Sequence, residues 1–373
     1  MTSSGPRSML TASRRYHPVR ASLLALLVIP FLLDAPCVFA EQPSTLPTVR
    51  LIATGGTISN RPGGRLTAEQ LIESIPLLDR FAVAEAEQFD NVESSMLTLD
   101  QWLELSRRVS ELLSGRPDLA GIVVATGTDT LEETAYFLHL TVRSEKPVVV
   151  VGSMRPPQSL SYDGAANLLQ GFRVAADNAA RGRGVLVVLN NEINSAREVS
   201  KTHAQRLQTF EARGYGVLGS VDADRVVYYR RTERRHTASS EFDVASIGRL
   251  PRVDVLLSYQ DASGDLITRA VEAGASGIVI AGAGAGSVSR DQREAIASVR
   301  AAGTPVVVTS RTGGGRVPAR PQPGRNTRPR QTSIAPPHIG GEDLSPVKAR
   351  ILLMLALTVT TDPEEIQRMF SEY

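Results

Sequence analysis

The chain has 373 residues, 42% of them hydrophobic and 21% charged, which is typical of a soluble globular protein with room for two well-buried domains. A formal net charge of only +2 gives no general case for nucleic-acid binding. Aromatic residues make up 5% of the chain, which argues against stacking platforms for single-stranded nucleic acid.

Met1–Ala40 is predicted to be a secretory signal peptide. It has four arginines near its start, an apolar run at Ala21–Leu33 that is short for a membrane span, and a small residue, Ala40, at the expected cleavage point. Of 41 basic and 39 acidic residues, four arginines and Asp34 leave with it, so 37 and 38 remain. Cys37, the single cysteine, leaves too. We therefore expect a periplasmic or secreted protein without disulfides or a stable membrane span, with an uncleaved anchor as the alternative.

Apolar runs then alternate with helical patterns, which is typical of parallel α/β sheets. We predict a two-domain α/β protein: a larger N-terminal catalytic domain at 48–230 with a flavodoxin-like parallel sheet, a polar linker at 231–252, and a smaller Rossmann-like α/β domain at 253–373. The expected strands are Val49–Ala53, Gly121–Ala125, Val148–Val151, Val185–Leu189, Val253–Leu257, Gly277–Ala281 and Val306–Thr309. The expected helices include Glu132–Leu140, Ala165–Ala180, Leu266–Ala273 and Asp291–Ala301.

Several helix starts carry their own signals. Thr67 and Thr98 each precede a glutamine by three residues, the spacing of a capping box. Ser345-Pro346 and Asp362-Pro363 follow the order of cap and then proline. Gly313–Pro337 has no apolar period and no acidic residue, and we interpret it as an irregular loop, with a polyanion-binding loop as the alternative.

Two threonine-rich turns follow buried strands. The first is Thr54-Gly55-Gly56-Thr57 and the second is Thr126-Gly127-Thr128-Asp129. Open α/β sheets bind ligands at the carboxyl ends of their strands, and glycines let the backbone approach a ligand closely. The structural alternative is a pair of strand-ending turns with capping threonines.

Other catalytic chemistries lack their motifs in this sequence. The histidines after the leader have no partner at metal-ligand spacing, and there is no Gly-x-Ser-x-Gly elbow or phosphate loop. Gly282–Gly286 only partly matches a dinucleotide fingerprint. No cofactor or metal is therefore expected. What remains is a threonine nucleophile, which needs a neighbouring base, and Lys201 and Asp129 are the candidates.

Four segments together resemble the bacterial L-asparaginase family. They are TGGTIS at Thr54–Ser59, ATGTDTLEETAYFL at Ala125–Leu138, KPVVVVGSMRP at Lys146–Pro156 and AREVSKT at Ala196–Thr202. The C-terminal Leu344–Leu357 matches as well, so the resemblance covers Val49–Tyr373. The leader suggests the exported type II branch.

The resemblance implies hydrolysis of the asparagine side-chain amide to aspartate and ammonia, without cofactor or metal. It implies that Thr57 is the nucleophile and that Thr128, Asp129 and Lys201 form a second catalytic cluster. Asp129 would also hold the α-ammonium of the substrate. Further substrate contacts are implied for Ser94, Ser95 and Ser153. The family also implies a homotetramer, a dimer of dimers, and a small amino-acid amide as the substrate.

The sequence departs from the family pattern around this core. There is no tyrosine between Val49 and Thr134, whereas the family usually has one in the loop after the first threonine turn. Arg65 lies in that short loop instead. Ser95 replaces a common glutamine, and Thr312–Gly341 offers no acid to a neighbouring subunit. The alternatives are therefore a glutaminase or other small-amide hydrolase, and a catalytically weak or inactive amino-acid-binding protein.

Overall fold

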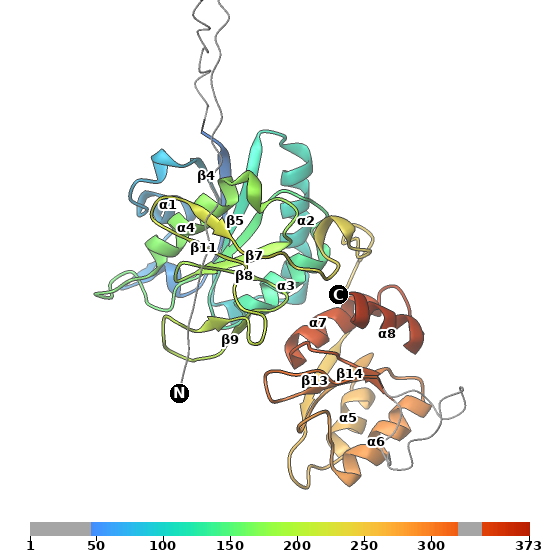
Figure 1. Cartoon of the computed structure of the whole chain (residues 1–373). Helices are drawn as coiled ribbons and strands as arrows, with labels where there is room; N and C mark the ends of the chain where they lie inside the picture. The colour runs from blue at the N-terminus through green and yellow to red at the C-terminus, as the bar shows by residue number, and fades with distance from the viewer. Residues whose placement is uncertain (1–45, 320–337) are drawn as a thin grey trace, which may run out of the picture. The chain divides into compact units, whose positions relative to one another are not determined.

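The computed structural model describes residues 46–319 and 338–373 (Figure 1). The predicted leader lies outside these residues, as does most of the predicted irregular loop. The described residues contain two larger sheets and eight α-helices. The helices are α1 (Ala68–Glu73), α2 (Leu99–Gly115), α3 (Leu131–Thr141), α4 (Gly164–Ala176), α5 (Asp265–Glu272), α6 (Arg290–Ala301), α7 (Pro346–Ala356) and α8 (Pro363–Glu372).

The larger sheet has eight strands in the order β12-β11-β8-β7-β6-β5-β1-β4. Five of them are parallel neighbours. Numbered along the chain, these five lie across the sheet in the order 2-1-3-4-5, which is the flavodoxin-like order. These five are β1 (Thr48–Gly55), β4 (Val83–Val92), β5 (Leu119–Ala125), β6 (Val148–Val151) and β7 (Val185–Leu189). The predicted flavodoxin-like parallel sheet is confirmed in these five strands.

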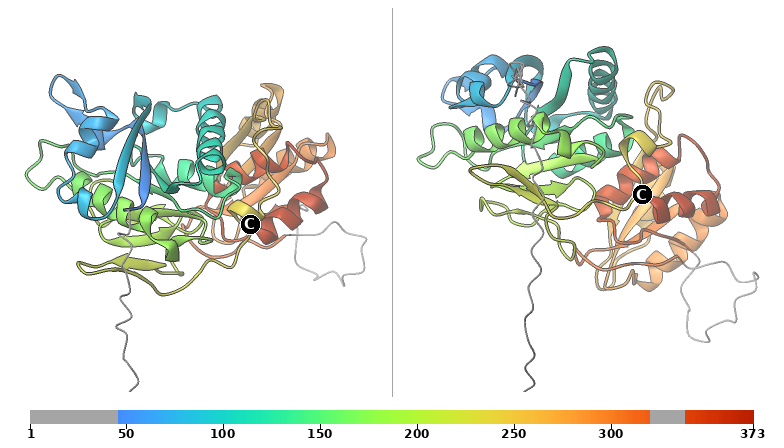
Figure 2. Two further views of the ribbon diagram at one scale, coloured as in Figure 1. Left: turned by 90° about the horizontal axis from the view of Figure 1, so that it is seen from above. Right: turned by 45° about the horizontal axis from the view of Figure 1, so that its top comes forward.

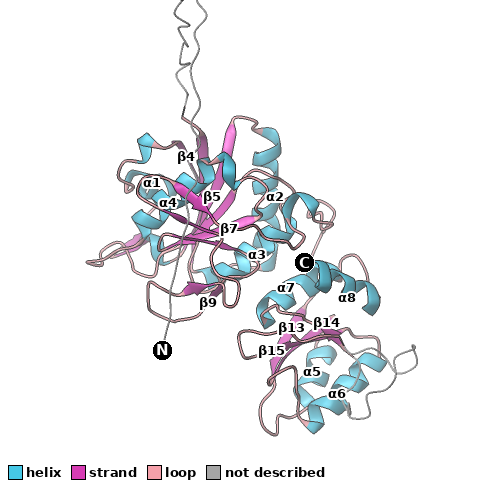
Figure 3. Ribbon diagram, in the orientation of Figure 1, coloured by secondary structure: helices cyan, strands magenta, loops and turns pink. Residues whose placement is uncertain are grey.

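Helices cover both faces of this sheet (Figure 3). Successive strand residues point to opposite faces, so Leu51 and Val123 pack with α1 and α4, while Ile52 and Val124 pack with α2 and α3. Because β5, β6 and β7 are buried on both faces, these strands are continuously apolar rather than alternating. That is why they could be recognised from the sequence.

The prediction missed three antiparallel strands that extend the sheet beyond β7. They are β8 (Glu192–Ser195), β11 (Gly219–Val221) and β12 (Val226–Tyr228). Each has only three or four residues, which is too short for a period in the sequence. The prediction also missed β4, whose half-exposed edge carries the charged residues Glu85 and Glu87, as edge strands commonly do.

The predicted helix caps are confirmed. The hydroxyls of Thr67 and Thr98 accept from the backbone N–H three residues on, and Gln70 and Gln101 complete both capping boxes. Ser345 and Asp362 cap α7 and α8, each with proline in the first turn. These interactions satisfy backbone donors that would otherwise lack partners at the helix starts.

The smaller sheet is parallel, as predicted, with its strands in chain order: β13 (Val253–Leu257), β14 (Gly277–Gly282), β15 (Val306–Ser310) and β16 (Ile339–Gly340). Val279 and Val307 pack with α7 and α8, whereas Ile278 and Ile280 pack with α5 and α6. Figure 2 gives two further views of both sheets. Two short hairpins complete the strands: β2 (Asn60–Arg61) with β3 (Gly64–Arg65), and β9 (Ser200–Lys201) with β10 (Phe210–Glu211).

Candidate active site

The two threonine turns lie side by side at the carboxyl edge of the larger sheet. β1 and β5 are adjacent and parallel, and Ala53 pairs with Ala125 at their last aligned position. In this strand order, the chain leaves β1 to one side for β4 and returns on the other side for β5. This is the switch point where open α/β sheets bind ligands.

Glycines allow the two turns to touch through their backbones. A Cβ added to Gly56 would lie 2.2 Å from the Cα of Gly127, and Gly56 has a φ of +91°. A Cβ added to Gly127 would lie 2.9 Å from the Ser94 Oγ. No side chain fits in these contacts. The turns that carry Thr57, Thr128 and Ser94 are therefore held together by backbone packing.

The threonines that precede the glycines join the turns below the surface. The hydroxyl of Thr54 donates to the Thr126 Oγ1 at 2.8 Å, and both residues are buried. Thr57 then begins a short 3₁₀ turn, Thr57–Ser59, and is half-buried. The buried pair thus fixes the base of the site, while Thr57 and Thr128 follow at its outer side.

Lys201 links two of the other predicted catalytic residues, Thr128 and Asp129. Its Nζ donates to the Thr128 Oγ1 at 3.0 Å and to the Asp129 Oδ1 at 2.6 Å. The Lys201 side chain is 13% exposed, whereas that of Asp129 is 78% exposed. Asp129 therefore has free surface for a ligand, and the N-cap residue of α3 is Thr130 rather than Asp129. This geometry favours a catalytic cluster over the alternative of a helix cap and a surface lysine.

Glu132 of α3 and Lys348 of α7 hold the Lys201 segment in place. The Lys201 N–H donates to the Glu132 Oε1 at 3.1 Å. The buried Lys348 of α7 donates to the Arg197 carbonyl at 3.0 Å and to the Val199 carbonyl. Burial lowers the pKa of Lys348 to about 8. The position of Lys201 thus depends on α3 of the larger domain and on α7.

Arg197 adds a buried ion pair to the same segment. Its guanidinium is 2% exposed and donates to both carboxylate oxygens of Asp343, at 2.7 and 2.9 Å. Burial alone would raise the pKa of Asp343, but the two hydrogen bonds and the charge of Arg197 outweigh it and hold that pKa well below its usual range. Asp343 therefore stays ionised in the folded state to lower pH than in the unfolded chain.

We expect Asp343→Asn to lower the free energy of unfolding by about 2–3 kcal/mol at pH 7, because Arg197 loses its charged partner. Since the folded-state pKa is depressed, the stabilisation by Asp343 exists above the unfolded pKa of about 4 and is lost as the pH falls further. Thermal unfolding of wild type and variant from pH 7 to pH 3 should show a shrinking difference. A difference that stays constant down to pH 3 would contradict this account. Asp265→Asn, at an exposed carboxylate, is the control.

The predicted substrate-binding serines surround the two turns. Ser94 is buried, and its Oγ accepts from the Thr130 N–H at 3.3 Å, which ties it to the second turn. Ser95, its neighbour, is exposed. Ser153 follows β6, is buried, and donates to the Arg155 carbonyl at 2.8 Å. The structure brings all the predicted site residues to the carboxyl ends of β4, β1, β5 and β6 or to the β9 segment.

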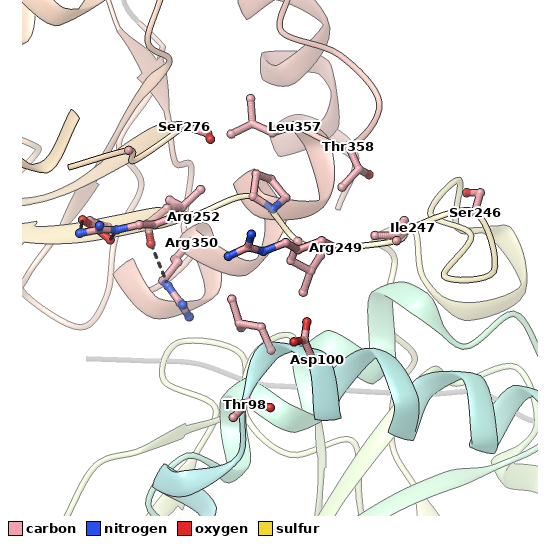
Figure 4. Close-up of a pocket in the computed structure, with 17 residues that line it drawn as sticks. Thr98, Asp100, Ser246, Ile247, Arg249, Arg252, Ser276, Arg350, Leu357 and Thr358 are labelled. Atoms are coloured by element: carbon pink, nitrogen blue, oxygen red, sulfur yellow. Dashed lines mark hydrogen bonds and ion pairs between the residues drawn. The ribbon is translucent and has the colours of Figure 1, made fainter. Parts of the chain in front are cut away.

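One cavity adjoins the cluster. It has a volume of about 700 Å³ and includes Lys201, Glu132 and Lys348 in its lining. Another, of about 790 Å³, lies between the start of α2 and the segment 246–254, with Asp100, Arg249 and Arg350 in its lining (Figure 4). None of the predicted site residues lines that second cavity. The contact between the two threonine turns and the Thr128–Lys201 hydrogen bond therefore indicate the candidate site, not cavity size.

Within residues 46–319 and 338–373, no group of three His, Cys, Asp or Glu side chains could hold a metal ion. Over the same residues, no helix is both long and apolar enough to cross a bilayer.

Sequence reasoning missed residues that support the site from a distance. The sequence pattern indicates only a helix at Glu132 and no role for Tyr162, whose hydroxyl donates to the Ile58 carbonyl at 2.9 Å. The partners are separated by 69 and 104 positions, so no local pattern signals either contact. Thr54 and Thr126 each lie in an Ala-Thr-Gly sequence, and this shared sequence indicates that they occupy equivalent positions in the two turns.

Comparison with known protein families identifies the family of this chain. The family model described as "Asparaginase, N-terminal" matches residues 48–234, and the "Glutaminase/Asparaginase C-terminal domain" matches residues 252–370. The chain belongs to the asparaginase family. The match covers both sheets and all the predicted site residues, so the resemblance noted in the sequence is confirmed at the level of the family.

Named relatives in the family span almost the whole chain. "L-asparaginase 2" of Bacillus subtilis (strain 168) is 42% identical over 90% of this chain and 88% of its own. "Glutaminase-asparaginase" of Pseudomonas fluorescens biotype A is 38% identical over 98% of this chain and 100% of its own. A crystal structure titled as a probable cytoplasmic L-asparaginase from Campylobacter jejuni is 37% identical, with a TM-score of 0.78, and covers 88% of this chain and 100% of its own.

Proposed function

We propose that this amidohydrolase of the asparaginase family cleaves the side-chain amide of L-asparagine through a covalent intermediate on Thr57. The observation that carries the proposal is Lys201, whose Nζ bridges Thr128 and Asp129 next to the Thr57 turn. A hydroxyl becomes a useful nucleophile only when neighbouring groups take its proton. The Thr128–Lys201 pair is the group that can relay that proton.

The reaction has two balanced steps. The Thr57 Oγ attacks the amide carbon of the substrate, its proton passes through the Thr128–Lys201 pair to the leaving nitrogen, and ammonia departs from an aspartyl ester. Water then attacks the ester, which releases aspartate and restores the Thr57 hydroxyl. Backbone amides of the glycine turns are the donors that would stabilise the oxyanion in each step.

Charge and exposure support the proposed binding roles. The Asp129 carboxylate is exposed and can pair with the α-ammonium of an amino acid. Ser94 and Ser95, in the turn after β4, would bind the α-carboxylate, and Ser153 would lie near the side-chain amide. Glutamine is the second candidate substrate, because one relative named above is a glutaminase-asparaginase.

The test is ammonia release from L-asparagine, L-glutamine and their D-forms. We expect L-asparagine to be hydrolysed, and Lys201→Met to lower kcat/KM by about 10²–10⁴-fold, because the proton relay is lost while the side-chain volume is kept. Lys146→Met removes another partly buried lysine, which bonds the Arg116 carbonyl, and is the matched control. Release from no amide, with asparagine still raising the melting temperature, would instead favour an amino-acid-binding protein.

The larger context is also part of the proposal. We propose that Met1–Ala40 directs export and is removed, so that the mature protein is periplasmic or secreted. We also propose that its domains span 48–230 and 253–373 around a linker. Four copies of the protein would assemble as a dimer of dimers. Mass spectrometry of the exported protein tests the cleavage after Ala40. Light scattering tests the tetramer, and a monomeric mass with full activity would contradict it.

A further inference from the structure

Tyr162 belongs to a loop that its own hydrogen bonds make rigid. The loop connects β6 to α4, and the carboxylate of Asp163 accepts from the Met154 and Arg155 N–H groups, both at 3.0 Å. Asn167 of α4 donates to the Gly152 carbonyl and to Asp163, each at 3.0 Å. The chain directly after Tyr162 is therefore anchored to the end of β6.

From this loop, the Tyr162 side chain reaches the turn that carries Thr57. Its hydroxyl donates to the Ile58 carbonyl at 2.9 Å, across 104 positions of sequence. Ile58 is fully buried and follows Thr57 directly in the 3₁₀ turn. Thr57 is thus held on one side by the packing of Gly56 on Gly127, and on the other by the phenol of Tyr162.

The surroundings of Tyr162 keep its hydroxyl protonated, so that it can donate a hydrogen bond. The ring is partly buried and packs against the apolar cluster under the first strand. Burial, together with the neighbouring carboxylate of Asp163, raises the pKa of the phenol above its usual value. The bond to Ile58 therefore persists across the pH range in which a hydrolase of this kind would work.

We propose that Tyr162 is a positioning residue for catalysis, which fixes the 3₁₀ turn so that the Thr57 hydroxyl faces the Thr128–Lys201 pair. This inference rests on the proposed function. Tyr162 acts through the Ile58 carbonyl and through no contact with the substrate. Because reaction rates depend steeply on the placement of the attacking atom, loss of this bond should affect the rate of the reaction much more than binding.

The test compares Tyr162→Phe, which removes only the hydroxyl, with wild type. We expect kcat for L-asparagine to fall about 10- to 100-fold, as for a small misplacement of a reacting group. The Kd for L-aspartate, the product, should change less than about twofold, and the melting temperature should fall by no more than about 4 °C, as for the loss of one hydrogen bond. Tyr229→Phe, which removes an exposed hydroxyl bonded to Ser220, is the matched control and should leave all three values unchanged.

An unchanged kcat in Tyr162→Phe would overturn the proposal. A fall in kcat accompanied by an equal weakening of aspartate binding would also overturn it, because that pattern indicates general loosening of the site. Failure of the proposed function has a different signature, since Thr57→Ala would then keep its activity whatever Tyr162→Phe does.

Discussion

Replacing Thr57 by alanine should lower kcat for L-asparagine by about 10⁴-fold or more, since removal of the proposed nucleophile eliminates the proposed covalent route. The fold should survive the change. Thr57 is half-buried, and the turn is held by Gly56 and Ile58 rather than by the threonine side chain. Steady-state ammonia release, measured on protein with a wild-type melting temperature, checks the result.

Two further variants sharpen this prediction. Thr57→Ser keeps a hydroxyl at the same place, primary instead of secondary, and should retain activity well above that of the alanine variant. Thr358→Ala removes a hydroxyl that bonds the Leu355 carbonyl at the end of α7, and should have no effect on kcat. Thr57→Ala with more than a tenth of wild-type activity would rule out Thr57 as the nucleophile.

Replacing Gly56 by alanine should damage both stability and catalysis. The new methyl group would lie 2.2 Å from the Gly127 Cα, and the φ of +91° disfavours any side chain. Strain and overpacking together should cost about 3–5 kcal/mol of unfolding free energy. Because the two turns must separate, we expect kcat to fall about 100-fold even in the folded fraction.

Gly63→Ala is the matched control for Gly56→Ala. Gly63 also has a positive φ, +82°, but a Cβ there meets no atom within 4 Å. We expect only the strain cost, about 1–2 kcal/mol, and an unchanged kcat. Denaturant unfolding and ammonia release on both variants provide the comparison. Equal losses of stability in the two variants would mean that the Gly56–Gly127 contact does not hold the site together.

The parallel core of the fold was predictable because its local signals agree with its tertiary environment. Strands such as Val148–Val151 are buried on both faces, so their sequences are continuous apolar runs. The capping residues Thr67 and Thr98 mark the starts of their helices in the sequence. The antiparallel strands after β7 are too short to show a period. Their formation depends on pairing in series, β8 with β7, β11 with β8 and β12 with β11, which the local sequence does not encode.

The residues of the candidate site likewise differ in how far local sequence patterns predict them. Thr57 and Thr128 could be predicted because each belongs to a short motif at the end of a strand. Lys201 could be named from its chemistry as a candidate base, but only the family resemblance placed it in one cluster with Thr128, since their contact spans 73 positions. Tyr162, with no motif of its own, became visible only through its contact with Ile58.

The covalent role of Thr57 is tested most directly by rapid acid quenching of the enzyme during turnover of L-asparagine, followed by peptide mass spectrometry. Trypsin should release Leu51–Arg65 intact across Arg61, because the next residue is Pro62. We predict that the mass of an aspartyl ester appears on this peptide, at Thr57, and that it is absent from Thr57→Ala. An aspartyl ester on Thr128, or on any residue other than Thr57, would contradict the account.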